Sequence, residues 1–474
     1  MATTSIPFGD ETLSLDLPPE TEVLRMGSVE PLTDPQAAIA GALDEPIGSP
    51  PLDEILREKV AAASAGPRAG AGTGAAGAGP TATIVIADNT RPVPYTGEQG
   101  ILWPLVERLV AAGVAEERIV VLVGTGTHHP LSSEIERMLD PRVLSSGVRV
   151  VSHDCRDDSQ LRTIGTTERG TEATLNVHYL DADIRISTGL VESHFFAGAS
   201  GGRKAICPGI VGEQATYSFH SAAAIASPDS THLKLDGNPH HEESFAVASM
   251  APPDFTVNVT LDSDYRLTGV FAGELDAAHR AAVAKIREYV EIPIEEPYDI
   301  VLTHGGFVSI NHYQAVKPAL VALEALALGG WLYLPAANTD DDPVGSLRYR
   351  TLVHLLRMIG PEAFTRLLFS DGWTFLPDQW EVQSWAKVDA AVAREKFVYY
   401  SPQCSRTDYE ILSGTDGNTL LPEPHRYTGD SANVQRVLDA FVARARRELA
   451  ARGIERPRIC FLFDGPYGIV TRGG

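Results

Sequence analysis

Side chains that can transfer protons or bind anions follow directly after several apolar runs of this sequence. The segment DNTRP places Arg91 three residues after Asp88, and the segment GTGTHHP carries His128. A histidine exchanges protons near neutral pH, and an arginine can bind a carboxylate through two parallel hydrogen bonds while an aspartate orients a neighbouring group. The alternatives are an ion pair between Asp88 and Arg91, and a plain surface histidine, which is the commoner fate of a lone loop histidine.

A glycine-rich segment, VESHFFAGASGGRKAICPGIVG at 191–212, carries a histidine and a lysine in one short stretch. Its GASGGRKA part is similar to the phosphate-binding loop G-x-x-x-x-G-K-[ST], but Arg203 replaces the second glycine and Ala205 replaces the hydroxyl that would bind magnesium. A nucleoside triphosphatase is therefore disfavoured. A glycine turn followed by Arg and Lys can still bring backbone N–H groups close to a phosphate. A tight loop with a solvated lysine is the alternative.

Three further segments carry polar or aromatic side chains whose roles the spacing leaves open. His220, sixteen residues beyond Lys204, is either a metal ligand or a hydrogen-bonded core histidine. YQAVKP sets Gln314 and Lys317 on one face of a starting helix, where both could hold an anionic substrate. Trp380 in PDQWEVQ either walls an apolar pocket or belongs to the core. The run HHEE at 240–243 lacks the H-E-x-x-H spacing of zinc sites, and the preceding GNP predicts a capped helix start instead.

An alternation of apolar strands and amphipathic helices must position these side chains. We expect buried strands at 81–88, 118–124, 148–155 and 182–194, and a helix at 100–113. Strands that alternate with helices form mostly parallel sheets, and ligands gather beyond the carboxyl ends of such strands. The chemically reactive residues at those ends are Asp88, Arg91, His128, His153 and His194.

The second half of the chain repeats the α/β pattern. A hairpin at 255–273 and a long helix precede a second α/β unit, which starts at 298 and ends with the strand RICFLFDG. Because 474 residues exceed what one core usually organises, we predict an α/β fold of two domains with mostly parallel sheets and the active site in the interdomain cleft. The predicted domains are 1–275, which binds a cofactor, and 276–474, which begins with a connecting helix at 276–291. The Ala/Gly-rich stretch at about 61–80 cannot pack and is expected to be a flexible surface insertion.

Composition and charge narrow the functional class. The net charge of −23 repels phosphate backbones, which argues against a broad nucleic-acid surface but allows an anionic small substrate. The four cysteines form no C-x-x-C pair, the first residues do not form a signal peptide, and no apolar stretch reaches the length of a membrane span. We expect a cytoplasmic protein without a membrane partner.

The order of these segments resembles that of one family. The set DNTRP, GTGTHHP, SHD, ESHFFAGASGGRKAICPG, HS, GNP, YQAVK and DQW is similar to the motifs of the nickel-pincer-nucleotide lactate racemases, from about Asp44 to the C-terminal strand. The motif ESHFFAG-x-SGGRK is long and unusual, which makes the resemblance specific. The resemblance implies an isomerase, a racemase or epimerase that inverts C2 of a small anionic 2-hydroxy acid.

The resemblance also implies a cofactor and roles for individual residues. Lys204 would carry the nickel-pincer nucleotide, a pyridinium-3,5-bisthiocarboxylic acid mononucleotide made by cofactor-biosynthesis proteins, through a thioamide link. His220 would be the protein ligand of the nickel, whose planar N/S/C environment suits that metal. His128 and His194 would be the paired acid/base residues. The residues around the substrate would be Arg91, Tyr313, Gln314, Lys317 and Trp380, and those around the cofactor Asp88, Ser200, Gly201 and Gly202.

The implied reaction explains the need for two histidines. A hydride leaves the C2–H bond for the cofactor while a histidine takes the hydroxyl proton, and the planar 2-keto acid accepts the hydride on its other face. Enantiomers present their hydroxyl groups on opposite sides, so each requires its own base. Cationic Arg91 and Lys317 would stabilise the anionic intermediate.

Two alternatives and two departures complete the sequence interpretation. The alternatives are a nicotinamide-dependent 2-hydroxy acid dehydrogenase, which the missing G-x-G-x-x-G after the first strand disfavours, and a non-catalytic carrier of the nickel cofactor. The departures from the family's pattern are His129 and the loop GGFVSINHYQ at 305–314. Both are expected in or near the cleft, so they concern the side chain of the substrate rather than the cofactor machinery.

Overall fold

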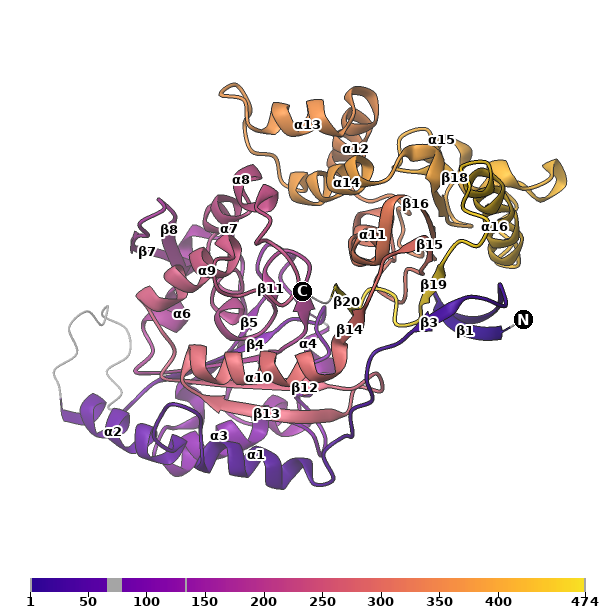
Figure 1. Ribbon diagram of the computed structural model, residues 1–474. Coiled ribbons are helices and arrows are strands. Elements are labelled where there is room, and N and C mark those ends of the chain that lie inside the picture. Colours follow the sequence, from indigo (N-terminus) through magenta and orange to yellow (C-terminus); the bar gives the residue numbers. More distant parts are fainter. Residues whose placement is uncertain (1, 66–78, 133, 473–474) are drawn as a thin grey trace. The chain divides into compact units, whose positions relative to one another are not determined.

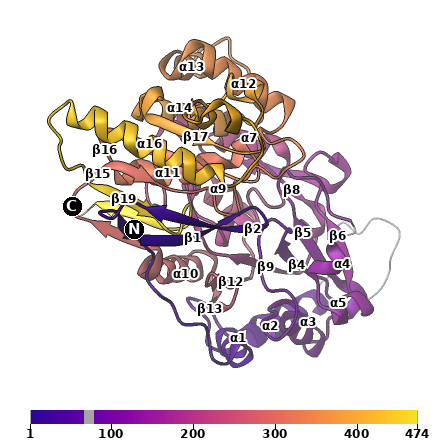
Figure 2. The same ribbon diagram turned by 90° about the vertical axis from the view of Figure 1, so that its right-hand side faces the viewer.

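The computed structural model of the protein describes residues 2–65, 79–132 and 134–472. The chain forms two compact units, which we call unit 1 and unit 2 (Figures 1 and 2). Unit 1 contains Met1–Gly27, Ser221–Ala226 and Tyr289–Gly474, and unit 2 contains Ser28–His220 and Ser227–Glu288.

Unit 2 is built on a six-stranded sheet with the order β13-β12-β9-β4-β5-β6, in which only β13 runs antiparallel to its neighbour. Runs such as ATIVIA and IVVLVG are apolar throughout because helices or loops cover both faces of a parallel sheet. The strands are β4 (Ala82–Ala87), β5 (Ile119–Gly124), β6 (Arg149–Ser152), β9 (Ile184–Leu190), β12 (Phe255–Leu261) and β13 (Leu267–Gly273).

Alternate residues of β4 enter different cores, because side chains of a strand point to opposite faces. Ile84 and Ile86 pack in one core with the helices α1 (Pro35–Asp44), α2 (Leu52–Ala65) and α3 (Leu102–Ala111). Val85 joins a second core with the helices α7 (Glu213–Phe219) and α9 (Pro239–Met250). The remaining helices and strands of unit 2 are α4 (Ile135–Met138), α5 (Pro141–Ser145), β7 (Leu161–Thr166), β8 (Glu172–Asn176), α6 (Val177–Leu180), β10 (Ser193–His194) and β11 (Gly198–Ala199).

Unit 1 contains a second six-stranded sheet, which is parallel throughout and has the order β18-β17-β16-β15-β19-β3. Its strands are β3 (Glu22–Leu24), β15 (Tyr298–Leu302), β16 (Leu326–Pro335), β17 (Phe397–Tyr400), β18 (Thr415–Asp416) and β19 (Ile459–Leu462). One face packs against α16 (Asn433–Ala450) and the hairpin of β1 (Ala2–Phe8) and β2 (Glu11–Leu17).

A group of helices completes unit 1. Helix α11 (His312–Ala325) packs on α14 (Gln379–Ala391), which also contacts α12 (Leu347–Ile359), α13 (Pro361–Leu368) and the short α8 (Ala222–Ala226). The amide of Gln383 on α14 donates a hydrogen bond of 2.8 Å to the carbonyl of Ala222. The remaining elements are β14 (Glu291–Ile294), α15 (Arg406–Tyr409) and β20 (Ile469–Arg472).

The structure confirms the predicted α/β class, the mostly parallel sheets and the hairpin at 255–273. The two units divide the chain differently from the predicted boundary at 275/276. The first 27 residues belong to unit 1 because β3 pairs with β19, and helix α10 (Leu275–Val290) belongs to unit 2 as far as Glu288. Residues 61–65 of the expected insertion are helical in α2, and 66–78 lie outside the described residues. None of the helices described in the structure is long and apolar enough to cross a membrane.

Candidate functional site

Three of the predicted residues follow the carboxyl ends of three neighbouring parallel strands in unit 2. Asp88 directly follows β4, His128 lies four residues after β5, and His194 lies four residues after β9. Strand β4 lies between the other two, with Ala87 opposite Gly124 and Val85 opposite Ser187. Since the chain turns from β4 toward β5 on one side and returns to β9 on the other, this edge is a switch point where ligands of α/β sheets bind.

Asp88 and His128 form a hydrogen-bonded pair at this edge. The Nδ1–H of His128 donates to Asp88 Oδ2 at 2.7 Å, and the carboxylate is 6% exposed whereas the histidine side chain is 59% exposed. Burial alone would raise the pKa of Asp88, but hydrogen bonds from His128 and Thr90 outweigh burial and hold the pKa below its ordinary value. An ionised Asp88 fixes the proton of His128 on Nδ1, so Nε2 keeps the lone pair that a base requires.

Arg91 takes a different carboxylate as its partner. Its Nη1 lies 3.7 Å from Oε2 of Glu192, which belongs to the loop after β9. The Asp88 carboxylate instead accepts from His128 and Thr90, so the Asp88–Arg91 ion pair that the spacing allowed is not the arrangement found. Arg91 is about one-third exposed and therefore retains access to solvent.

The glycine-rich segment forms a tight turn at 200–205, which we call the Lys204 turn. Gly201 and Gly202 have φ angles of 73° and 51°, a region that side chains other than glycine rarely adopt. A Cβ on Gly202 would lie 2.5 Å from the ring of His279, so there is no room for a side chain at this position. The Gly202 N–H donates to Asn258 Oδ1 at 2.8 Å. Lys204, two residues further, is half-buried.

Ser200 and Arg203 anchor the same turn to the backbone of neighbouring loops. The Ser200 hydroxyl donates to the Leu190 carbonyl at 2.8 Å, and the Ser200 carbonyl accepts from His279 Nε2–H at 2.8 Å. Arg203 is 1% exposed, and its guanidinium donates to the carbonyls of Ala197 and Ala199. These hydrogen bonds fix the backbone that carries the half-buried Lys204.

His220 at the C-terminal end of α7 has the protonation pattern of a metal-binding imidazole. Its Nδ1–H donates to the Thr216 carbonyl at 2.8 Å, which leaves the lone pair on Nε2. Burial, with a smaller contribution from the positive charge of Lys204, lowers the pKa of His220 to about 4. The ring packs against Phe196 and His240, with ring centroids 5.2 and 5.5 Å away. Within residues 2–65, 79–132 and 134–472 there is no group of three or more His, Cys, Asp or Glu that could hold a metal ion.

In unit 1 the predicted substrate residues share one surface of two packed helices, which we call the α11–α14 face. Asn311 caps α11 through its Oδ1, which accepts from the Gln314 N–H, and Tyr313, Gln314 and Lys317 are all half-buried. Trp380 of α14 donates from Nε1 to the Tyr313 hydroxyl at 2.9 Å. The buried Gln314 Oε1 makes no hydrogen bond within the described structure.

Glu381, next to Trp380, is a residue that the sequence interpretation did not select. It is 4% exposed, and its Oε2 is buried without a hydrogen-bond partner among the described residues. Burial raises the pKa of Glu381 to about 8, although the positive charge of Lys317 acts in the opposite direction. A carboxyl group one residue from a predicted pocket wall is the signal that could have found it.

Other histidines serve the fold or its surface. His153 is fully buried between the Val211 carbonyl, to which its Nε2–H donates, and the amide of Asn176, and burial lowers its pKa. His129 is exposed. The HHEE run begins α9 after the N-cap Asn238, as predicted from GNP.

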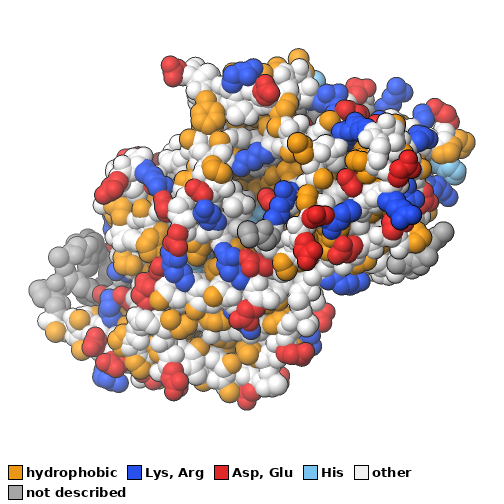
Figure 3. Space-filling model, viewed as in Figure 1, with side chains coloured by type: hydrophobic (Ala, Val, Ile, Leu, Met, Phe, Trp, Pro, Cys, Tyr) orange, Lys and Arg blue, Asp and Glu red, His pale blue; other side chains and the backbone are white. Residues whose placement is uncertain are grey.

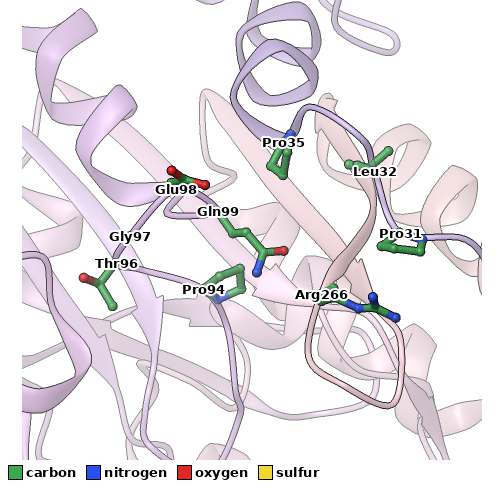
Figure 4. Close-up of a pocket in the computed structure, with 9 residues that line it drawn as sticks. All are labelled: Pro31, Leu32, Pro35, Pro94, Thr96, Gly97, Glu98, Gln99 and Arg266. Atoms are coloured by element: carbon green, nitrogen blue, oxygen red, sulfur yellow. The ribbon is translucent and has the colours of Figure 1, made fainter.

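Surface features lie apart from these residues. Figure 3 shows acidic and basic side chains interspersed over the visible face. A hollow of about 450 Å³ in unit 2 is lined by nine residues, none of which belongs to the predicted site (Figure 4). The lining residues are Pro31, Leu32, Pro35, Pro94, Thr96, Gly97, Glu98, Gln99 and Arg266.

Comparisons with known proteins agree on one family. Residues 73–232 match the family described as the lactate racemase N-terminal domain. The chain is 31% identical over 355 residues to a lactate racemase of Lactiplantibacillus plantarum, covering 74% of this chain and 77% of that protein. It is 30% identical to a lactate racemase of Thermoanaerobacterium thermosaccharolyticum over 82% of this chain and 86% of the relative.

Two solved structures have a similar fold. The lactate racemase apoprotein from Thermoanaerobacterium thermosaccharolyticum superimposes with a TM-score of 0.79 at 24% identity, covering 99% of this chain and all of that structure. A protein from Thermotoga maritima superimposes with a TM-score of 0.56 at 15% identity, covering 90% of this chain and all of that structure.

Proposed function

The chain belongs to the lactate racemase family, and from this premise we propose that it is an isomerase that inverts C2 of a lactate-like 2-hydroxy acid. The observation that carries the proposal is the Asp88–His128 pair, which lies on the same sheet edge as the loop that leads to His194 and the Lys204 turn. A base poised at Nε2 is what removal of a hydroxyl proton requires.

The residues of unit 2 fit the cofactor that the family resemblance implies. The Lys204 turn offers an amine on a rigid glycine backbone, and His220 offers an Nε2 lone pair on a neutral ring. Because no larger ligand cluster occurs in the described residues, a nickel ion at His220 would take its other ligands from the nucleotide. When bound to Lys204, the nickel-pincer nucleotide would supply the acceptor for the C2 hydride. Asp88, Ser200, Gly201 and Gly202 would surround it.

The side chains of the protein would handle the proton and the charges. His128 Nε2 would take the hydroxyl proton of one enantiomer, and the resulting imidazolium would be stabilised by the ionised Asp88. His194 would serve the hydroxyl group of the other enantiomer. A 2-keto acid would form between the two half-reactions. The residues that would hold the substrate carboxylate and oxygen atoms are Arg91, Tyr313, Gln314 and Lys317, with Trp380 as an apolar wall.

Two other functions make different predictions. A nicotinamide-dependent dehydrogenase would convert one enantiomer into a keto acid and reduce a free nucleotide, whereas a racemase converts it into its mirror image. A nickel-cofactor carrier would load Lys204 and yet exchange no hydrogen at C2. The ordered base at His128 favours a catalyst over a carrier, because storage requires no aligned base.

The decisive experiment tests the tether and the reaction together. The full chain is produced in the cytoplasm with the cofactor-biosynthesis proteins, and the Lys204 peptide is analysed by mass spectrometry while bound nickel is measured. We expect a covalent adduct on Lys204, about one nickel per chain and inversion of at least one compound in a panel of 2-hydroxy acids. Lys204→Ala should lose all three, and Lys234→Ala, which removes a surface ion pair of the same unit, should lose none. An active protein with unmodified Lys204 would overturn the proposal.

A further inference from the structure

The ring of His194 accepts hydrogen bonds from backbone N–H groups of its own hairpin. His194 lies in the short hairpin of β10 and β11, and its Nδ1 accepts from the N–H groups of Phe196 at 3.5 Å and Ala197 at 3.3 Å. The Phe195 ring stacks on the imidazole at 5.0 Å, and the Phe196 ring contacts it edge-on at 4.5 Å. A nitrogen that accepts hydrogen bonds carries no proton, so the neutral ring must carry its proton on Nε2.

Asn238 supports one of these donors through a single peptide group. Its side-chain amide donates to the Phe196 carbonyl at 2.9 Å, and the N–H of that same peptide group is the Ala197 N–H that donates to His194. A carbonyl that accepts a hydrogen bond polarises its peptide and strengthens the N–H as a donor. Asn238 is itself fully buried and fixed, because its Oδ1 caps α9 by accepting from the N–H groups of His240 and His241.

Arg203 holds the other side of the same hairpin. Its guanidinium donates to the carbonyls of Ala197 at 2.7 Å and Ala199 at 2.8 Å. The residue that precedes the predicted tether lysine therefore also fixes the turn that carries the second predicted histidine. Ala197 is held through its carbonyl by Arg203 and through its N–H by His194.

The two predicted acid/base residues are consequently held as opposite tautomers. His128 keeps its proton on Nδ1, facing Asp88, and presents a lone pair at Nε2. His194 accepts at Nδ1 and presents Nε2–H. We propose that Asn238 is a positioning residue that holds His194 as the Nε2–H tautomer, so that the resting protein offers one base, His128, and one hydrogen-bond donor, His194.

For the proposed racemase, on which this part of the inference rests, the two directions of reaction begin differently. An enantiomer whose hydroxyl faces His128 transfers its proton directly to Nε2 and leaves an imidazolium beside Asp88. The product alkoxide of this direction takes its proton from His194 Nε2–H while solvent supplies a proton to Nδ1, and solvent later removes the proton from His128. An enantiomer whose hydroxyl faces His194 meets an N–H at the start, so solvent must first move that proton from Nε2 to Nδ1, which breaks the two backbone hydrogen bonds. The kcat for this enantiomer should be lower by at least about fivefold, the order expected from the loss of two such interactions at the weak end of their usual range.

The equilibrium constant of the racemisation determines which kinetic parameters can differ between the two enantiomers. A racemisation has an equilibrium constant of one, so kcat/KM is equal in the two directions whatever the tautomers. The difference must therefore occur as lower kcat and proportionally lower KM for one enantiomer. A merely structural role of Asn238 would change both directions alike.

The direct test is the tautomer of His194 in the full chain. The protein is labelled with ¹⁵N-histidine, each ring nitrogen is correlated with the ring carbon-bound protons by NMR, and His194 is assigned by its absence in His194→Gln. We expect protonated Nε2 and unprotonated Nδ1 in the unmodified sequence. A protonated Nδ1 there overturns the proposal, and this measurement needs neither cofactor nor activity.

A matched pair of variants tests Asn238 itself. Asn238→Asp keeps the cap of α9 but removes the amide donor, and we expect its His194 to populate the Nδ1–H form. Asn176→Asp makes the same change at another buried N-cap, whose amide donates to His153; it should alter the His153 signals and leave those of His194 unchanged. An unchanged His194 in Asn238→Asp overturns the role of Asn238.

With the loaded enzyme, Asn238→Asp should bring the kcat values of the two enantiomers within about twofold of each other. Equal kcat values in the unmodified enzyme overturn the catalytic part of the inference. A protein without any inversion activity but with the expected His194 tautomer would instead count against the proposed function alone.

Discussion

The Lys204 turn of unit 2 and the α11–α14 face of unit 1 hold their polar groups in different ways. In the Lys204 turn, side chains and backbone bind one another: Ser200 to Leu190, Gly202 to Asn258 and Arg203 to two carbonyls. On the α11–α14 face, Gln314 Oε1 and Glu381 Oε2 are buried without a hydrogen bond within the described structure.

This difference indicates two kinds of binding. An unpaired buried polar atom costs free energy, about 1–3 kcal/mol, which a ligand that supplies the partner recovers. The Lys204 turn also leaves two buried atoms unpaired among the described residues, but both are donors, Arg203 Nε and Asn258 Nδ2, whereas Gln314 Oε1 and Glu381 Oε2 are acceptors. We expect the acceptors of the α11–α14 face to pair with a ligand that donates hydrogen bonds. The departure at 305–314 leads directly into α11, so it concerns the region that would recognise the substrate.

The largest effect that would test this comparison is expected at His128. His128→Gln removes the base but keeps a polar side chain, so kcat for inversion should fall by about 10²- to 10⁴-fold while KM changes little. Asp88→Asn should also lower kcat, by a smaller factor, because the proton on His128 Nδ1 loses its fixed acceptor. Steady-state kinetics of both enantiomers measure this.

The adjacent histidine is a matched control. His129→Gln changes an exposed residue of the same loop, and its kcat should equal that of the unmodified enzyme. A similar loss in both variants would mean that the loop is merely disturbed, and that unit 2 does not hold the base.

A second effect is expected in the packing of the Lys204 turn. Gly202→Ala would place a Cβ 2.5 Å from the His279 ring at a φ of 51°, so we expect a loss of about 1–3 kcal/mol in the stability of unit 2. Thermal unfolding followed by circular dichroism measures the loss, and adduct formation on Lys204 should fall with it.

The control keeps the backbone strain and removes the clash. Gly113→Ala has a φ of 101° and no atom within 4 Å of the added Cβ, so it should destabilise clearly less than Gly202→Ala. Equal melting temperatures for the two variants would contradict the tight packing of the turn.

The local sequence predicted some residues of the candidate site but not the residues that reach it from distant parts of the chain. Asp88 and His128 could be predicted because each lies within four residues of the end of an apolar strand. Asn238, Asn258 and His279 reach the Lys204 turn or the His194 hairpin from 34 to 75 residues beyond Lys204, and no periodicity encodes such contacts. The same limit explains why β3 was not expected beside β19, since a three-residue strand gains its place only from pairing with a distant partner.

A smaller effect should separate the α11–α14 face from the proton-transfer residues. Tyr313→Phe keeps the ring contact with Tyr349 but removes the hydroxyl that accepts from Trp380. Loss of one hydrogen bond of about 0.5–1.5 kcal/mol predicts a KM higher by about 2- to 10-fold with little change in kcat. Tyr349→Phe also removes one hydrogen bond, to His312, and should leave KM unchanged. A fall in kcat alone for Tyr313→Phe would place this face in the chemistry instead.

The last effect is expected from Glu381 and depends on pH. Burial raises the pKa of Glu381 to about 8, whereas the unfolded chain releases this proton near pH 4.5. Between these values the folded protein binds more protons than the unfolded one, so Glu381 lowers stability as the pH rises from about 4.5 to about 8. Glu381→Gln removes that cost and should match the unmodified protein near pH 4.5 but melt at progressively higher temperatures as the pH approaches 8.

The exposed Glu362 on α13 is the control for this pH dependence. Glu362→Gln removes the same charge from the same unit at a solvated position, so its melting temperature should follow that of the unmodified protein at every pH. If Glu381→Gln also followed it, the carboxyl would be hydrated when the protein is folded, and the α11–α14 face would lack the buried acceptor that distinguishes it from the Lys204 turn. A difference that grows with pH would instead identify Glu381 as a carboxyl group that stays buried in the folded protein, close enough to Lys317 for their charges to interact.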